Sequence, residues 1–136
     1  SGRSIEKRLR SEGYIPKISS LSRCYGGDMG RITCADLAEA ARAGDMFACV
    51  ELDKIAESFS ISLVNILAAQ GVDTVVIGGG VAKMGDILFD RIRKFTDNLA
   101  FIANKGRYQI LKSELLDDAV LVGALLVASG GYVEII

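Results

Sequence analysis

Apolar positions in this chain follow two spacings, one typical of helices and one typical of buried strands. The longest helical pattern lies in residues 45–70, where apolar residues recur three and four positions apart: Leu52, Ile55, Ala56, Phe59, Leu63, Ile66 and Leu67. Asp45 is a favourable N-cap for this helix, and Gly71 is placed to end it. Almost every residue from Ile61 onward is apolar, which predicts a second half buried on all sides.

Shorter helices are predicted on both sides of this long one. Residues 3–10 form a short basic helix, whose charged face we interpret as solvated surface. Thr33 is expected to cap a helix that Gly44 ends, and Asp36 lies three residues after the cap, as in a capping box. Another helix is expected from Gly85 to Asn98, with one apolar face formed by Leu88, Ile92, Phe95 and Leu99.

Short apolar runs predict the strands. Thr74 to Ile77 is rich in β-branched residues and is expected to be a buried central strand, and Tyr108 to Leu111 is a second strand. A last helix is predicted from Ala119 to about Ser129, and Gly123 in its interior indicates close approach to a neighbouring strand or ligand. The tail Tyr132 to Ile136 is either a terminal strand or an interface segment.

This order of helices and strands indicates an α/β fold. Residues 13–31, which include Pro16 and several glycines and serines, are expected to form a loop. A sheet of two or three strands is too small to cover the apolar faces of all these predicted helices. We therefore expect residues 1–136 to be a single partial domain, which belongs to something larger or associates through its sheet edge.

The composition excludes several classes of function. The chain has 136 residues, with 16 basic and 17 acidic side chains and a net charge of -1, so it carries no electrostatic footprint for DNA or an anionic membrane. No apolar run reaches the roughly 18 residues of a membrane span, and Ser1-Gly2-Arg3 does not begin a signal peptide. The sequence contains no histidine, which excludes histidine acid–base chemistry within this chain.

The three cysteines give no sign of a metal site or a catalytic thiol. Cys24, Cys34 and Cys49 form no C-x-x-C pair, and without histidine they make a poor zinc set. We expect free thiols. Cys49 lies in the apolar stretch Phe47 to Val50 and is expected to be a small core residue, with no base nearby to activate it.

The most informative motif is Gly78-Gly79-Gly80, directly after the predicted central strand. Ligands of open α/β sheets bind outside the carboxyl ends of strands. Missing side chains let a flat or phosphorylated ligand lie against the backbone. A tight turn that needs a positive φ and binds nothing explains the same residues, so both interpretations stay open on this motif alone.

An ordered set of motifs covers nearly the whole chain. It comprises Ala43-Gly44-Asp45, the strand and glycines followed by Val81-Ala82, Gly85 with Leu88 and Ile92-Arg93, and the run Asp117 to Ala124. This set resembles the C-terminal half of the ROK family, which contains sugar kinases and NagC-like sugar-responsive transcriptional repressors. Ser1 to Ile5 is similar to the segment that follows the zinc motif of that family. The resemblance implies the C-terminal lobe of an actin/hexokinase-like (ribonuclease H-like) ATPase fold.

The resemblance also implies roles for single residues. Gly78, Gly79, Gly80 and Val81 would lie where the family's kinases place the adenosine of ATP. Gly123 and Ala124 would belong to the last helix and pack close to the sheet beneath that site. The kinases of the family transfer the γ-phosphoryl group of ATP to a sugar hydroxyl, with an aspartate as base and Mg²⁺ on the phosphates. The phosphate loop, the catalytic aspartate and the zinc ligands of the family have no counterpart here. The chain is therefore expected to be half of a longer protein, with no catalytic or metal-binding residue and no activity alone.

Three functions remain in competition. The first is the C-terminal lobe of a glucokinase-like enzyme that phosphorylates a hexose with ATP, which the intact glycines favour. The second is the same lobe of a NagC-like repressor that binds a sugar and holds DNA through an N-terminal helix-turn-helix outside this chain. The third is an interaction module that dimerises and binds no small molecule. We expect a cytoplasmic protein without membrane contact, and a homodimer formed by the long helix or the apolar tail.

Overall fold

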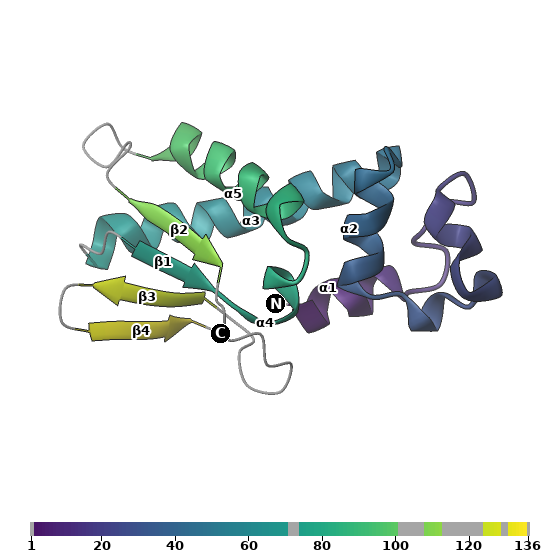
Figure 1. Cartoon of the computed structure of the whole chain (residues 1–136), viewed down its shortest axis with the longest axis horizontal. Helices are drawn as coiled ribbons and strands as arrows, with labels where there is room; N and C mark the ends of the chain where they lie inside the picture. The colour runs from purple at the N-terminus through teal and green to yellow at the C-terminus, as the bar shows by residue number, and fades with distance from the viewer. Residues whose placement is uncertain (1, 71–73, 101–107, 113–123, 129–130, 136) are drawn as a thin grey trace.

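The computed structural model describes residues 2–70, 74–100, 108–112, 124–128 and 131–135. One end of the molecule contains a four-stranded sheet, and the other end is helical (Figure 1). The longest helix, α3 (Met46–Gln70), connects the two ends. The chain starts beside α4 (Gly79–Ala82), in the middle of the molecule.

The helical end contains α1 (Gly2–Leu9) and α2 (Cys34–Arg42), as expected from the pattern. Thr33 and Asp36 form the predicted capping box, in which each side chain accepts a hydrogen bond from the backbone N–H of the other residue. Between the two helices, the chain forms 3-10 turns at η1 (Ser20–Gly27) and η2 (Met29–Arg31).

Helix α3 begins after Asp45, as predicted, and the carboxylate of Asp45 accepts a hydrogen bond from the Ala48 N–H at 3.0 Å. One face of this helix enters the core, where Leu52, Leu63 and Leu67 are at most 4% exposed. The prediction that its second half is buried on all sides is wrong, because Ile61 is 51% exposed. Within the described residues, α3 packs mainly on α2 and on α5 (Asp86–Leu99), which leaves its outer face uncovered.

The sheet confirms an α/β fold and has one strand more than the sequence pattern predicted. The strands are β1 (Thr74–Ile77), β2 (Gln109–Lys112), β3 (Ala124–Ala128) and β4 (Gly131–Ile135), in the order β2-β1-β3-β4. Strand β1 runs parallel to β2 and antiparallel to β3, and β4 returns antiparallel to β3. The two strands predicted from the β-branched runs are both present.

The predicted helix from Ala119 to Ser129 is wrong over residues 124–128, which form β3. Ala124 pairs with Ile77, and Val127 pairs with Thr74, so this segment takes the second edge of β1. A continuous apolar run of this length fits a buried helix or a strand equally well, and only its partner decides between them. For the tail, the strand alternative is confirmed over residues 131–135. Gly123, Asp117 and Asp118 lie outside the described residues.

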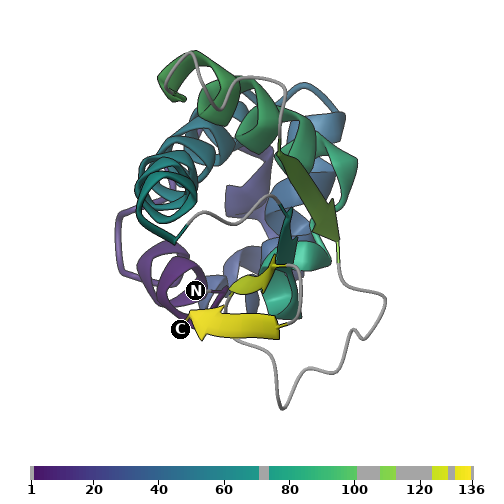
Figure 2. The same ribbon diagram turned by 90° about the vertical axis from the view of Figure 1, so that its left-hand side faces the viewer.

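Helices α3 and α5 lie side by side across the sheet end, as the end-on view shows (Figure 2). Leu88 and Ile92 of α5 are fully buried, whereas Leu99 at its end is 46% exposed and does not belong to the predicted apolar face. The buried hydroxyl of Ser60 on α3 donates to the Ile92 carbonyl at 3.2 Å and joins the two helices. None of the described helices is long and apolar enough to cross a membrane.

Candidate functional site

The glycine segment, Gly78 to Val81, lies where the sequence predicts it, at the carboxyl end of β1. Gly78 is extended, with φ -122° and ψ -171°, and it precedes the short helix α4. Gly79 then adopts φ +74°, a left-handed conformation that a residue with a Cβ rarely adopts. The predicted turn with positive φ is therefore present. Gly78, Gly79 and Val81 are buried and Gly80 is partly exposed, so Gly80 is the residue of this turn whose backbone reaches the surface.

The first residue of α1 packs directly against this turn. A Cβ on Gly2 would lie 3.4 Å from the Gly80 Cα and 3.6 Å from the Val81 nitrogen. A Cβ on Gly80 would in turn lie 3.8 Å from the Gly2 Cα. The two backbones are therefore in close contact, and the start of α1 reaches the segment that the resemblance assigns to the nucleotide.

The loop that follows the glycine segment contacts α2 and leads into α5. Arg42 at the end of α2 donates from Nη2 to the Met84 carbonyl oxygen at 2.7 Å. Gly85, at φ +75°, forms the N-cap of α5. Sequence analysis missed Arg42, because a contact between residues 42 positions apart leaves no periodic signal.

A buried carboxylate joins α1 to α3. Glu51 is 1% exposed, and its Oε1 accepts a hydrogen bond from the Tyr14 hydroxyl at 2.7 Å. Its Oε2 accepts from Arg8 at 3.2 Å, and Lys54 lies 3.3 Å from Oε1. Burial, followed by the hydrogen bond to Glu51, raises the pKa of Tyr14. All these groups satisfy one another within the protein, so we assign the cluster a structural role.

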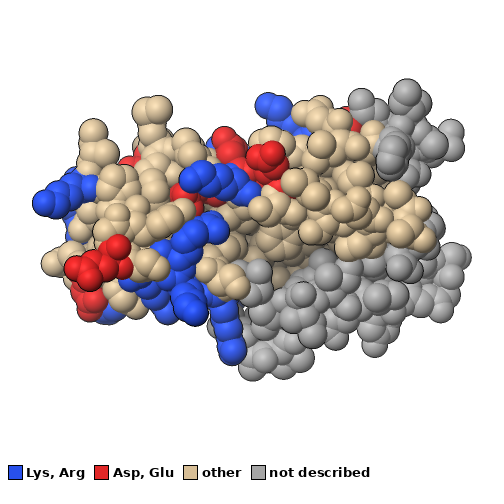
Figure 3. Space-filling view, turned by 180° about the vertical axis from the view of Figure 1, so that it is seen from behind, with Lys and Arg blue, Asp and Glu red and all other residues tan. Residues whose placement is uncertain are grey.

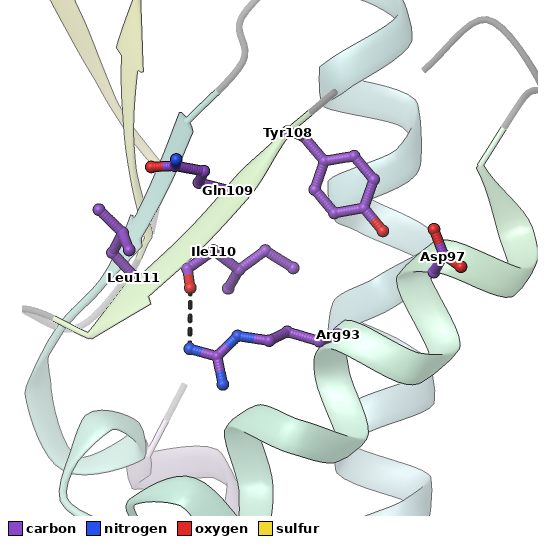
Figure 4. Close-up of a pocket in the computed structure, with 6 residues that line it drawn as sticks. All are labelled: Arg93, Asp97, Tyr108, Gln109, Ile110 and Leu111. Carbon is purple, nitrogen blue, oxygen red and sulfur yellow. Dashed lines mark hydrogen bonds between the residues drawn. The ribbon is translucent and has the colours of Figure 1, made fainter. Parts of the chain in front are cut away.

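A shallow groove of about 390 Å³ follows the edge strand β2 (Figure 4). It is lined by Arg93, Asp97, Tyr108, Gln109, Ile110 and Leu111. The Arg93 side chain connects α5 to β2 along this groove, since its Nη2 donates to the Ile110 carbonyl oxygen at 3.0 Å. Burial and the nearby Asp97 carboxylate raise the pKa of the Tyr108 phenol. No residue of the glycine segment lines this groove.

Basic side chains gather on the back of the molecule (Figure 3). The exposed residues Arg3 and Lys7 of α1, with Arg10 just after it, line a depression of about 510 Å³ together with Glu6 and Ser11. The Arg10 side chain is held in place, because its Nε donates to the Ile32 carbonyl oxygen. The Glu6 carboxylate, 3.8 Å from the guanidinium, offsets part of its positive charge. This agrees with a charged, solvated helix face.

The cysteines are free thiols, as predicted. Cys34 is buried, whereas Cys24 and Cys49 are partly exposed and pack against the core. Within the described ranges, no group of three or more Cys, Asp or Glu side chains could hold a metal ion. We therefore assign no chemical step to a metal that these residues would bind.

Comparison with known proteins identifies the family. The model of the ROK family matches residues 1–130. The chain is 31% identical to a glucokinase of Thermotoga maritima over 118 residues, which is 87% of this chain and 37% of that protein. It is 33% identical to a glucokinase of Halalkalibacterium halodurans over 119 residues, covering 85% of this chain and 35% of that protein. A xylose repressor of Caldicellulosiruptor bescii is 24% identical over 122 residues, covering 90% of this chain and 29% of the repressor.

Solved structures agree at the level of the fold. A ROK family glucokinase from Streptomyces griseus, in complex with glucose and AMPPNP, superposes with a TM-score of 0.72 at 24% identity, over 85% of this chain and 38% of that one. A sugar kinase structure described as putative, from Cytophaga hutchinsonii, gives a TM-score of 0.67 at 22% identity, over 88% of this chain and 38% of that one. The chain thus spans 35% to 37% of the length of the two glucokinases that it matches in sequence. With its family model matched over residues 1–130, the chain belongs to the ROK family.

Proposed function

We propose that this chain forms the C-terminal, nucleotide-binding part of an ATP-dependent sugar kinase of the glucokinase type. One observation carries the proposal: the bare glycine turn after β1 lies in a chain that is 31% and 33% identical to two glucokinases. The structure that superposes at a TM-score of 0.72 is a glucokinase in complex with glucose and AMPPNP, an ATP analogue.

In this proposal, the adenosine of ATP lies against the turn formed by Gly78, Gly79, Gly80 and Val81 and meets it at Gly80. Gly78 and Gly79 are buried and Gly80 is partly buried, so a flat ligand that reaches Gly80 meets backbone rather than side chains. Phosphoryl transfer depends on positioning and on neutralising charge, and Mg²⁺ bound to the ATP phosphates supplies the charge. The catalytic base, the phosphate loop and the family's zinc ligands would lie outside this chain. We also propose that the protein is a cytoplasmic homodimer.

A second candidate is the sugar-binding lobe of a transcriptional repressor. It is favoured by the 24% identity to a xylose repressor over 90% of this chain. In that case a helix-turn-helix outside this chain would contact DNA, and the glycine turn would remain as a structural element.

The two candidates differ in which ligands stabilise the intact protein. A ligand at 100 times its Kd stabilises the native state by about 2.7 kcal/mol. A kinase is stabilised by ATP with Mg²⁺ as well as by a hexose, and it forms ADP in the presence of both. A repressor is stabilised by the sugar but not by ATP, and its DNA binding weakens steeply with salt. An interaction module responds to neither ligand.

A matched pair of variants tests the assigned turn. Gly79→Leu places a side chain in the buried turn beneath the proposed adenosine position, at φ +74°, so its thermal stability is measured together with ATP binding. Gly13→Leu introduces the same backbone strain at φ +73°, with nothing within 4 Å of the added Cβ. We expect loss of ATP binding in Gly79→Leu only. ATP binding that survives this change would show that the adenosine lies elsewhere.

A further inference from the structure

The loop that follows the glycine turn is tied to the helical end by one arginine. Arg42 ends α2, and its Nη2 donates to the Met84 carbonyl oxygen at 2.7 Å. A hydrogen bond of this length from a guanidinium is charge-assisted and stronger than a neutral one. Met84 itself is fully buried, so the guanidinium binds the backbone at the point where this loop enters the core. The guanidinium also pairs with Glu39 one turn earlier on α2, at 3.2 Å.

The backbone around Met84 is shaped to receive this guanidinium. The Met84 N–H donates to the Val81 carbonyl at 3.1 Å, and the Gly85 N–H donates to the Ala82 carbonyl at 3.2 Å. These bonds continue α4 into a tight turn that leads to α5. A Cβ at Gly85 would lie 3.2 Å from Arg42 Nη2, so a side chain there would crowd the guanidinium.

The glycine segment is thereby held from two directions. At its start, the Gly2 backbone contacts Gly80 and Val81. Three residues beyond its end, Arg42 donates to the carbonyl oxygen of Met84. α2 is also connected to α1, because the Cys34 N–H donates to Glu6 at 2.9 Å. The Arg42 contact thus adds a hydrogen bond to the packing of α2 on α4 and α5, close to the end of the Gly78 to Val81 segment.

We propose that Arg42 is a positioning residue for the nucleotide site. It does not touch the ligand surface itself; it fixes the Val81–Gly85 turn, and with it the bare backbone on which the adenosine lies. This inference rests on the proposed kinase function. It predicts that loss of the guanidinium weakens the use of ATP and leaves the use of the sugar unchanged.

The test uses the intact protein and measures the KM for ATP and for the sugar separately. In Arg42→Met, we expect the KM for ATP to rise about tenfold, equivalent to about 1.4 kcal/mol, with the KM for the sugar unchanged. Arg42→Lys keeps a positive donor that can reach the same carbonyl, so it should restore most of the affinity for ATP. If Arg42→Met does not fold, Arg42→Gln, which lacks the charge, takes its place, and a KM for ATP equal to that of the wild type would overturn the role of Arg42.

Two control variants separate the Met84 contact from general effects of surface charge. Glu39→Gln removes the ion pair of Arg42 but leaves its bond to Met84, so the KM for ATP should not change. Arg91→Met removes another arginine that pairs with a carboxylate, Asp53 at 2.8 Å, and donates to a backbone carbonyl. It lies on α5 away from the turn and should also leave the KM for ATP unchanged.

The possible results distinguish this inference from the proposed function. A wild-type protein that is neither stabilised by ATP nor able to transfer phosphate overturns both. A wild-type kinase in which Arg42→Met leaves the KM for ATP unchanged overturns only the role of Arg42. Equal increases in both KM values in this variant would also overturn it, because they would indicate general destabilisation. Faster amide exchange in residues 79–85 of Arg42→Met, with only the KM for ATP raised, supports it.

Discussion

Replacement of Asp45 by alanine should destabilise the protein more than the loss of an ordinary helix cap. The Asp45 carboxylate accepts three hydrogen bonds, from the Ser20 N–H at 2.9 Å, the Ser19 hydroxyl at 2.9 Å and the Ala48 N–H at 3.0 Å. It thus caps α3 and also anchors the start of the η1 segment. Asp45→Ala releases both connections at once.

The expected cost follows from these partners. Loss of the α3 cap costs about 1 kcal/mol. Ser19 is 1% exposed, so its hydroxyl loses its acceptor in a place that water does not reach, at a cost of about 1–3 kcal/mol. The Ser20 N–H is half-buried and can recover part of its bond from water. We therefore expect Asp45→Ala to lower the free energy of unfolding by about 2–4 kcal/mol.

The same carboxylate should make stability depend on pH. Burial alone would raise the pKa of Asp45, but the hydrogen bonds from Ser20, Ala48 and Ser19 outweigh burial and lower the pKa below its usual value. A lowered pKa in the folded state stabilises the protein above the unfolded value of about 3.9. This contribution is lost as the pH falls through the folded pKa. Asp45→Asn should retain the cap and lose this part of the acid dependence.

Urea unfolding of the intact protein, followed by circular dichroism, measures these effects at pH 7 and at decreasing pH. Asp28→Ala is the matched control, because Asp28 is exposed and its side chain accepts one hydrogen bond, from the Gly30 N–H at 3.2 Å. We expect that control to cost about 0.5 kcal/mol. The reasoning fails if Asp45→Ala costs no more than Asp28→Ala, or if Asp45→Asn retains the full acid dependence.

Three further predictions concern buried groups. Tyr14→Phe removes the 2.7 Å hydrogen bond to the buried Glu51 carboxylate and should cost about 1.5–3 kcal/mol in urea unfolding; a cost near zero would mean that water replaces the phenol. Thr96→Val should be neutral or stabilising by up to about 1 kcal/mol, because the buried Thr96 Oγ1 has no hydrogen-bond partner among the described residues; clear destabilisation would reveal a partner. Burial, with Glu6 nearby, raises the pKa of the Cys34 thiol to about 12. Mass spectrometry should therefore show that this thiol is alkylated at pH 8 only after the protein unfolds, and rapid labelling of Cys34 in the native protein would contradict its burial.

Local chemistry made the helices and the glycine turn predictable. Thr33 with Asp36 and Asp45 mark helix starts because their side chains satisfy the first free N–H groups, whatever lies beyond. The β-branched run Thr74–Ile77 and the glycines after it similarly indicate a buried strand that ends abruptly. The turn Gly78 to Val81 could be predicted because its residues are contiguous in the chain, whereas its contacts with Gly2 and the Arg42 bond just beyond it could not.

Burial and pairing were less predictable because they depend on distant segments. The apolar second half of α3 looks the same in sequence whether or not another element covers it, and Ile61 is half exposed. The run Ala124–Ala128 was predicted as a helix, yet in the structure it pairs with β1. Its apolar residues would suit either form, and the free edge of β1 supplies the backbone hydrogen bonds that favour a strand.

The sequence by itself determined where most elements begin and end, which residues form the bare turn after β1, and that histidine chemistry is absent from this chain. Only the tertiary structure decided which surfaces meet. It placed Gly2 against Gly80, Glu51 against Tyr14, and Arg42 against the Met84 carbonyl. The physical reason is range: caps and hydrophobic periodicity act over a few neighbouring residues, whereas these contacts join residues 37, 42 and 78 positions apart, which only the folded chain brings together.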